Sequence, residues 1–402
     1  MAFQKRLSVC RASLKTELMR NKSIIIFVST MDGDPWGGSE ELWSRTALDL
    51  AAQGFSVCAS VHEWSPPHKR VLALVEGGVD VWVRPSRYSI WKRAWRKVTR
   101  TQEAFMVAEL RKQIVSNVPS LVVMSSGSAL PPIELLELCI SEKVPFVTIG
   151  QANHEAWWPA DDDARRYRNA LPAALRCYFV STANLRLAEK QVGCAIPNAE
   201  VVWNPFNIEF STSLAWPLSA DGEVLFACVG RLHPPSKGQD ILLEAFAGQD
   251  WADRNWRLTF YGEGRMQDSL ERLVERLGLG DRVIFSGHAS VADIWASNHV
   301  LALASRYEGL PLVMVEAMLC GRPVVATNVA GHSELIEDGV VGFLADAPTV
   351  ASVAKALERL WERRSEAEQL GKAAAARIRQ LVPPDPIHVF SEKIKKLVET
   401  RR

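Results

Sequence analysis

The chain has 402 residues, a formal net charge of +1, 48% hydrophobic residues and 23% charged residues. A near-neutral chain has no global basic field, which disfavours nucleic-acid binding, and this length accommodates two ordinary domains. No apolar run approaches the ~20 residues that span a bilayer, the basic stretch 1–22 has no signal-peptide core, and seven dispersed cysteines indicate a reducing cytosol.

The first half of the chain alternates short apolar runs with helical stretches. Strands are predicted at residues 23–30, 55–61, 79–83, 121–124, 145–149 and 177–180, with helices such as 40–53 and 103–115 between them. This alternation is typical of a parallel, doubly wound sheet. Asn204-Pro205-Phe206-Asn207 interrupts the pattern, and the loose stretch that follows, to about residue 222, is interpreted as a connection between domains.

The alternating pattern restarts at Glu223. Strands are predicted at residues 224–229, 257–261, 283–285, 300–304, 324–327 and 342–344. The fold class is therefore α/β, with two Rossmann-like domains over residues 23–205 and 206–385 and a cleft between them. Because ligands of open α/β sheets bind beyond the carboxyl ends of the strands, the strand-exit loops are the candidate functional segments.

The stretch 299–346 contains a strand, a polar turn and a helix start. The strand at 300–304 ends in a turn with Glu308 and Gly309, and Pro311 suits the first position of the following helix. Free N–H groups at a helix start favour an anion such as a diphosphate. The residues of this start are Leu310, Pro311, Leu312 and Val313. Glu308 and Glu316 flank it, and carboxylates suit a hydroxyl-rich ligand.

One motif in this stretch resembles a known family. It consists of two Glu residues eight apart, then Ala317-Met318-x-x-Gly321-x-Pro323-Val324-Val325-Ala326-Thr327, then Gly331-x-x-Glu334. This pattern resembles the retaining glycosyltransferases of glycosyltransferase family 4 (glycosyl transferases group 1), which have the GT-B architecture.

The resemblance implies a separate role for each of the two domains. The first domain would bind an acceptor, the second a nucleotide sugar, and a C-terminal helix at 386–402 would pack back on the first. Glu316 would bind the ribose hydroxyls and Glu308 the hexose hydroxyls. No cofactor and no metal would be needed.

Three strand exits of the second domain resemble donor-binding loops of the family. Gly230-Arg231 and Lys237-Gly238 match its Gly-Arg and Lys-Gly pairs, and two cations suit a diphosphate leaving group. Gly262 lies in a Gly-x-Gly turn that matches the second exit. His288 lies in the loop that resembles the one receiving the nucleotide base, with a solvated loop histidine as the alternative.

Two loops of the first domain hold further candidates. Gly37 and Gly38 stand where the family places a Gly-Gly pair, and backbone without Cβ atoms can approach a phosphate; a plain turn is the alternative. His154 is the candidate for contact with the transferred sugar or the acceptor hydroxyl, with Asn153 as the alternative. Trp157 and Trp158 either stack on sugar faces or belong to the core, and Ser125-Ser126-Gly127 stands where many relatives carry a histidine.

The sequence thus predicts a metal-independent hexosyltransferase that moves a hexose from a nucleotide-diphosphate sugar to a hydroxyl of a glycan, lipid-linked or small-molecule acceptor. Asp161-Asp162-Asp163 is interpreted as a helix start rather than a metal site, because Arg165 and Arg166 follow at helix spacing. A catalytically silent sugar-nucleotide-binding protein and a dinucleotide-dependent Rossmann oxidoreductase are the alternatives. Gln267 replaces the third glycine that a dinucleotide fingerprint needs after Gly262.

Residues 87–100 combine basic and aromatic side chains. The apolar positions recur at helical spacing, namely Ile90, Trp91, Ala94, Trp95 and Val98. This pattern predicts a helix in peripheral contact with an anionic membrane, with packing on the sheet as the alternative. The expected location is cytoplasmic, on the inner face of the membrane, with a role in polysaccharide biosynthesis.

Overall fold

The computed structural model describes residues 23–31, 33–84, 101–219 and 222–400, so the basic stretch 1–22 and the helix expected at 87–100 lie outside the described residues. The chain forms two compact units. The first holds the described residues up to Ile149, Arg166–Cys177 and the chain from Phe390 onward; the second holds Gly150–Arg165 and Tyr178–Val389. The expected domain limits, 23–205 and 206–385, stay a prediction.

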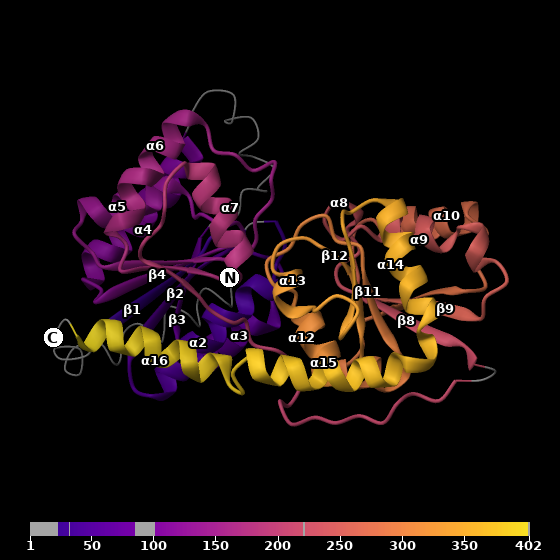
Figure 1. The fold of residues 1–402 in the computed structure, drawn as a ribbon. Helices are drawn as coiled ribbons and strands as arrows, with labels where there is room; N and C mark the ends of the chain where they lie inside the picture. The colour runs from indigo at the N-terminus through magenta and orange to yellow at the C-terminus, as the bar shows by residue number, and fades with distance from the viewer. Residues whose placement is uncertain (1–22, 32, 85–100, 220–221, 401–402) are drawn as a thin grey trace. The chain divides into compact units, whose positions relative to one another are not determined.

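The first sheet follows the order β3-β2-β1-β4-β5-β6-β7 within the described residues, and Figure 1 labels its strands β1 to β4. β1 pairs in parallel with β2 and β4, and β2 with β3. The strands are β1 Ile24–Ser29, β2 Ser56–His62, β3 Asp80–Arg84, β4 Leu121–Ser126, β5 Phe146–Gly150, β6 Arg176–Phe179 and β7 Ala199–Val201. The six predicted strands are confirmed. β7 was not predicted, because Ala-Glu-Val is too short to form an apolar run.

Helices connect these strands, as the sequence pattern predicts. They are α2 Glu41–Ala52, α3 Lys69–Glu76, α4 Thr101–Asn117, α5 Ile133–Ser141, α6 Asp161–Ala170 and α7 Thr182–Val192. The triple-aspartate stretch does begin a helix, α6, with all three acids in its first turn. The last helix, α16, spans Pro386–Glu399, and the chain from Phe390 onward belongs to the first unit, as expected for a C-terminal helix that returns there.

The second sheet follows the order β10-β9-β8-β11-β12-β13. Its strands are β8 Val224–Val229, β9 Trp256–Tyr261, β10 Val283–Gly287, β11 Val300–Leu303, β12 Val324–Thr327 and β13 Gly342–Ala345, all of which were predicted. The pairings between neighbours are parallel. The main helices are α8 Pro234–Lys237, α9 Gln239–Phe246, α10 Gln267–Arg276, α11 Val291–Ser297, α12 Leu312–Leu319, α13 His332–Leu335, α14 Val350–Glu362 and α15 Ala367–Leu381.

The strand order places β8 beside β11 at the centre of the second sheet, where the winding direction reverses. Both strands are rich in Val, Leu and Ala and largely buried, as strands covered on both faces must be. Ligands of doubly wound sheets bind beyond the carboxyl ends at such a reversal point. The loops after Val229 and Leu303 are therefore the segments that this fold offers to a ligand.

The helix after β11 begins one residue later than expected. Pro311 has an extended backbone, with φ −69° and ψ 122°, and is the N-cap of α12 rather than its first residue. The end agrees with the prediction, since Gly321 has φ 73°, the left-handed conformation that closes a helix.

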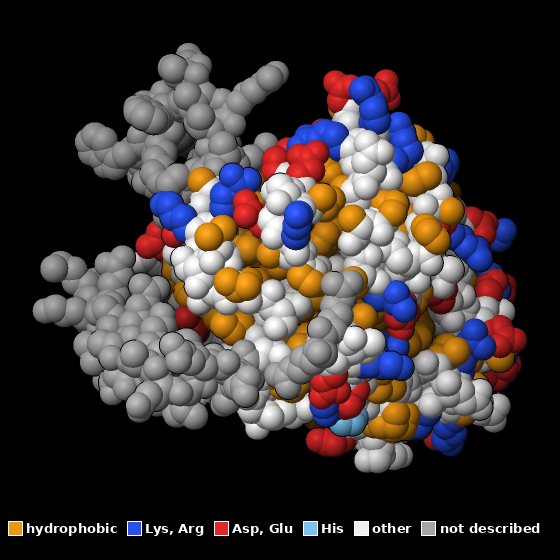
Figure 2. Space-filling model, turned by 90° about the vertical axis from the view of Figure 1, so that its left-hand side faces the viewer, with side chains coloured by type: hydrophobic (Ala, Val, Ile, Leu, Met, Phe, Trp, Pro, Cys, Tyr) orange, Lys and Arg blue, Asp and Glu red, His pale blue; other side chains and the backbone are white. Residues whose placement is uncertain are grey.

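One face of the molecule carries charges of both signs. Figure 2 shows one face on which Lys and Arg side chains are intermixed with Asp and Glu, in keeping with the net charge of +1. Among the described residues, no helix has both the length and the apolar character that crossing a membrane requires.

Candidate functional site

The exits of β8 and β9 lie against each other in the second unit. The Gly230 N–H donates to the Tyr261 carbonyl at 2.9 Å, and the Leu232 N–H donates to the Glu263 carbonyl at 3.0 Å. Gly262 has φ 127°, and a Cβ at this position would lie 2.2 Å from the Gly230 oxygen. A side chain at position 262 would therefore force the two strand exits apart.

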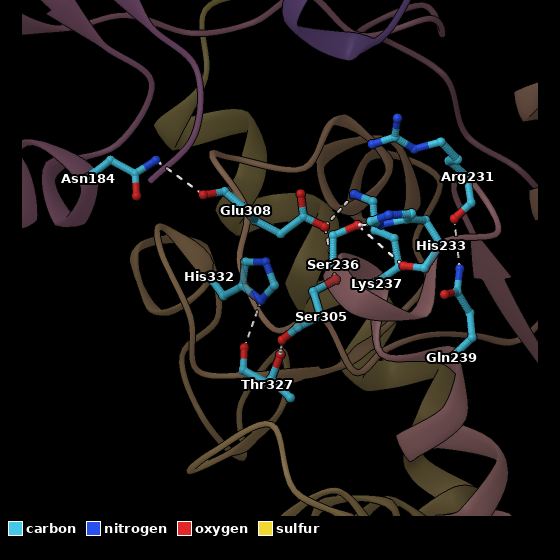
Figure 3. Close-up of polar contacts among 10 residues, drawn as sticks. All are labelled: Asn184, Arg231, His233, Ser236, Lys237, Gln239, Ser305, Glu308, Thr327 and His332. Atoms are coloured by element: carbon cyan, nitrogen blue, oxygen red, sulfur yellow. Dashed lines mark hydrogen bonds and ion pairs between the residues drawn. The ribbon is translucent and has the colours of Figure 1, made fainter. Parts of the chain in front are cut away.

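The loop after β8 carries both expected cations. Its path is held by Gln239, whose amide donates to the Arg231 carbonyl at 2.8 Å, and by the 2.7 Å contact between His233 Nδ1 and Ser236 Oγ (Figure 3). Arg231 is exposed, whereas the Lys237 side chain is only 23% exposed. The loop thus presents one cation to solvent and turns the other inward.

Lys237 reaches the carboxylate of Glu308, which lies 71 residues further along the chain. Lys237 Nζ is 2.5 Å from Glu308 Oε1, and Ser305 Oγ donates to the same oxygen at 2.9 Å (Figure 3). Burial by itself raises the pKa of Glu308, but Lys237, His332 and Ser305 outweigh it and hold this pKa below its usual value. Glu308 is therefore an ionised, nearly buried carboxylate at neutral pH.

The turn that carries Glu308 is fixed to both neighbouring elements. Arg306 forms two hydrogen bonds with Asp240, at 2.7 and 2.8 Å, and its N–H donates to the Ser236 carbonyl at 2.8 Å. Thr327 Oγ1, at the end of β12, donates to the Ser305 carbonyl at 2.6 Å. These bonds align the exits of β8, β11 and β12, so that the position of Glu308 is set by three strands.

The segment with His154 contacts the turn with Glu308 inside the second unit. A Cβ on Gly309 would lie 1.7 Å from the Gln151 carbonyl oxygen, so only glycine allows this approach. The His154 ring meets Tyr307 edge-on with centroids 4.9 Å apart, and Trp157 meets the same ring at 4.9 Å. Trp157 and Trp158 are 41% and 55% exposed, so they do not belong to the core.

Asn153, the alternative to His154, is occupied by structural bonds. Its amide donates to Gln191 Oε1 at 2.9 Å, and its Oδ1 accepts from the His154 N–H at 2.8 Å. His154 Nδ1 accepts from the Ala156 N–H at 2.9 Å. The polar atoms of the Asn153 side chain are thus engaged within the protein, and the ligand contact expected of His154 stays a prediction.

Glu316 lies within α12 and is 4% exposed. Its Oε1 accepts from the backbone N–H of Asn207 at 2.9 Å and from the Asn207 side-chain amide at 3.1 Å. Asn207 belongs to the stretch expected to connect the domains, and no sequence pattern indicated its contact with Glu316. The expected ribose contact of Glu316 stays a prediction.

The remaining candidates lie in the first unit or at a strand exit. Gly37 is the N-cap of the short 3-10 helix Gly38–Glu40, which directly precedes α2. His288 is exposed in the loop after β10, and this loop is tied to the β9 exit because the Gly262 N–H donates to the Gly287 carbonyl at 2.8 Å. Their expected phosphate and base contacts stay predictions.

Two buried ionisable side chains of the first unit, whose charges interact, were not predicted from the sequence. Glu40 and Arg84 are each 3% exposed. Burial raises the pKa of Glu40 to about 7 and lowers the pKa of Arg84 to about 10. Glu40 Oε2 accepts from Trp43 Nε1 at 2.9 Å, and Arg84 Nη1 donates to Ser60 Oγ at 2.9 Å. Because Glu40 and Arg84 are far apart in the sequence, no local sequence pattern indicated that their charges interact.

His332 and Glu334 were not among the site residues predicted from the sequence. His332 has no exposed surface, and its Nδ1 is 2.7 Å from the Thr327 carbonyl oxygen. Glu334 accepts from the N–H groups of Thr182 and Ala183, at the start of α7, at 3.1 and 2.8 Å. In the part of the chain that the structure describes, no group of three His, Cys, Asp or Glu side chains could hold a metal ion.

The two parallel-sheet α/β units have the arrangement of the GT-B fold, and solved structures share this fold. The chain superposes on HepE of Anabaena, solved with UDP, with a TM-score of 0.70 and 20% identity over 94% of this chain and 99% of that chain. It superposes on sucrose-phosphate synthase of Thermosynechococcus elongatus with a TM-score of 0.71 and 18% identity over 95% of this chain and 100% of that chain.

Part of the second unit also resembles one family in sequence. Residues 214–377 match the family model described as "Glycosyl transferases group 1". The chain is 32% identical over 158 residues to the alpha-D-kanosaminyltransferase of Streptomyces kanamyceticus, covering 39% of this chain and 41% of the relative. It is 37% identical over 152 residues to the D-inositol 3-phosphate glycosyltransferase of Segniliparus rotundus, covering 34% of each. The matches thus span less than half the length of these relatives.

Proposed function

We propose that the protein is a glycosyltransferase that moves a hexose from a nucleotide-diphosphate sugar to a hydroxyl of a glycan, lipid-linked or small-molecule acceptor. The observation that carries this proposal is the Lys237–Glu308 pair at the reversal point of the second sheet. It places a cation for a phosphate and a carboxylate for sugar hydroxyls in contact, beside the start of α12.

The proposed chemistry is electrostatic stabilisation of the departing diphosphate. Arg231 and Lys237 provide positive charge, and the backbone around residues 310–313 and the Gly37-Gly38 turn provide N–H donors. Glu308 binds hexose hydroxyls and Glu316 binds ribose hydroxyls, since a carboxylate accepts two hydrogen bonds at once. None of these roles needs a proton on Glu308, in keeping with its lowered pKa.

The finer parts of the proposal concern family, stereochemistry and metal. We place the chain in glycosyltransferase family 4, with retention of configuration at the transferred sugar and no metal requirement. The pattern Glu308 to Glu334 supports the family assignment, and two cations in the loop after β8 support charge neutralisation by the protein itself. Among its structural neighbours, HepE has been solved with UDP-glucose, which makes UDP the first nucleotide to test.

A thermal-shift screen against UDP, GDP, ADP and dTDP tests the proposal. A ligand that binds only the folded state raises the unfolding temperature. We expect one of these nucleotides to stabilise the wild type, and the matching nucleotide sugar to support transfer or slow hydrolysis. Stabilisation should be lost in Arg231→Ala and kept in Arg272→Ala, an exposed arginine on α10. A folded protein that none of the four nucleotides stabilises would refute the proposal.

A further inference from the structure

His332 carries a nitrogen for which the structure supplies no partner. Its Nδ1 is 2.7 Å from the Thr327 carbonyl oxygen. Because a carbonyl only accepts, Nδ1 must hold a hydrogen, and the neutral ring then has its lone pair on Nε2. Nε2 is buried and has no hydrogen-bond partner among the described residues. A buried acceptor without a partner is costly and calls for an explanation.

The His332 ring faces the charged pair of the candidate site. Figure 3 shows it between Thr327 and Glu308, with the second ring nitrogen on the side of Glu308. No hydrogen bond joins His332 to Glu308, but the Glu308 carboxylate favours the protonated form of His332 and Lys237 disfavours it. Nε2, an acceptor, therefore lies on the side of the Glu308 carboxylate, which is also an acceptor.

The groups that act on His332 come from three neighbouring elements. Glu308 lies in the turn after β11 and Lys237 at the end of α8. Cys228, on β8, also lies near this pair, but burial raises the pKa of its thiol to about 12 and it stays neutral. On α13 itself, the Glu334 carboxylate binds the backbone N–H groups of Thr182 and Ala183. Glu308 and Lys237 are thus the charged side chains that act on His332, in addition to its burial.

These two charges act on the imidazole in opposite directions. Burial lowers the pKa of His332 below its usual value, Glu308 raises this pKa and Lys237 lowers it. While Lys237 stays on Glu308, the balance keeps His332 neutral at pH 7. If Lys237 moves away, one opposing charge is lost and the carboxylate of Glu308 acts on His332 alone.

We propose that His332 is a positioning residue for Glu308: when a nucleoside diphosphate draws Lys237 away, His332 takes a proton from the solvent at Nε2 and becomes the cation that holds the carboxylate. The inference rests on the proposed function, in which Lys237 binds the diphosphate. A buried carboxylate that loses its partner is strongly destabilised. Proton uptake by His332 prevents this loss and keeps Glu308 oriented for the hexose.

Isothermal titration calorimetry of UDP binding at pH 7, in buffers with different ionisation enthalpies, measures this proton uptake. The observed heat changes with the buffer in proportion to the protons taken up. In His332→Asn the side-chain amide can still donate to the Thr327 carbonyl, but it cannot titrate. Glu308→Gln removes the charge that His332 would compensate. His388→Asn removes an exposed histidine on α16 and is the matched control.

We expect greater proton uptake in the wild type and in His388→Asn than in His332→Asn and Glu308→Gln. Any protons exchanged by the diphosphate itself are common to all four proteins and cancel in the comparison. The wild type should also bind UDP more tightly as the pH falls from 8 to 6, by a larger factor than His332→Asn, because protons and nucleotide then bind together.

Equal uptake in the wild type and His332→Asn would overturn this inference while leaving the proposed function intact. If His332→Asn fails to fold, equal uptake in the wild type and Glu308→Gln would overturn it in the same way. If UDP gives no heat, the titration is repeated with GDP, ADP and dTDP. Failure of all four to bind the folded wild type would overturn the proposed function and this inference with it.

Discussion

Lys237 and Glu308 form an ion pair with 2.5 Å between Nζ and Oε1, with side chains that are 23% and 10% exposed. The pair joins the first and fourth strands of the second sheet in chain order, β8 and β11, at their carboxyl ends. Removal of one partner from a buried pair leaves an uncompensated charge and costs about 3–5 kcal/mol. The contribution of this ion pair to the free energy of unfolding can therefore be measured without any assay of catalytic activity.

Lys237→Met should lower the free energy of unfolding by an amount at the lower end of that range, because Lys237 retains some solvent contact and because His332 can take a proton beside Glu308. Adding Glu308→Gln should restore most of the loss, since no buried charge then remains unpaired. Urea unfolding of the single and double variants at pH 8 measures both effects. Two losses that simply add would show that the ion pair contributes little coupling energy.

Arg231→Ala should lower turnover by about 10²- to 10³-fold, which is the usual effect of losing one donor to a developing oxyanion. The exposed position of Arg231 means that folding should be unaffected. Steady-state rates with the nucleotide sugar identified by the screen decide this, with Arg272→Ala as the control. Near-normal turnover in folded Arg231→Ala would show that Arg231 does not stabilise the departing diphosphate.

Glu316→Gln should weaken binding of the free nucleoside diphosphate, because this carboxylate is placed at the ribose. Glu308→Gln should leave that binding nearly intact and lower transfer, because it is placed at the hexose. Calorimetry with the nucleotide and rate measurements with the nucleotide sugar separate the two. Equal loss of nucleotide affinity in both variants would mean that ribose and hexose have been assigned wrongly.

Activity should persist in EDTA, because Arg231, Lys237 and the α12 start are proposed to neutralise the diphosphate. Rates are compared with and without chelator, and with added magnesium or manganese after dialysis. Loss of activity on chelation that either metal restores would contradict the metal-independent mechanism.

The stability of the first unit should depend on Glu40. A carboxyl group whose pKa is raised on folding, here from 4.5 to about 7, binds its proton more tightly when folded. The buried carboxylate therefore lowers the free energy of unfolding only above pH 4.5. This loss of stability grows as the pH rises to about 7, up to roughly 3 kcal/mol. Glu40→Gln should gain stability over the wild type between pH 5 and pH 8, measured by urea unfolding. The exposed Glu76→Gln is the control, and a constant difference for Glu40→Gln would contradict the prediction.

The sequence by itself determined the order of strands and helices and the family resemblance. Apolar runs such as 224–229 and 324–327 form strands with those same limits, because a strand buried on both faces needs a continuous apolar run. Candidates such as Arg231, Lys237, Glu308 and His154 could be selected because local order places them just after strands. These features depend on neighbouring residues, which a sequence records directly.

Only the tertiary structure decided which of these side chains meet. The bond from Lys237 to Glu308, the position of Asn207 on Glu316 and the facing of His332 toward Glu308 join residues from separate elements. The same holds for Glu40 and Arg84 in the first unit. Such contacts and their pKa shifts arise from burial and from distance in space, and neither quantity is set by spacing along the chain.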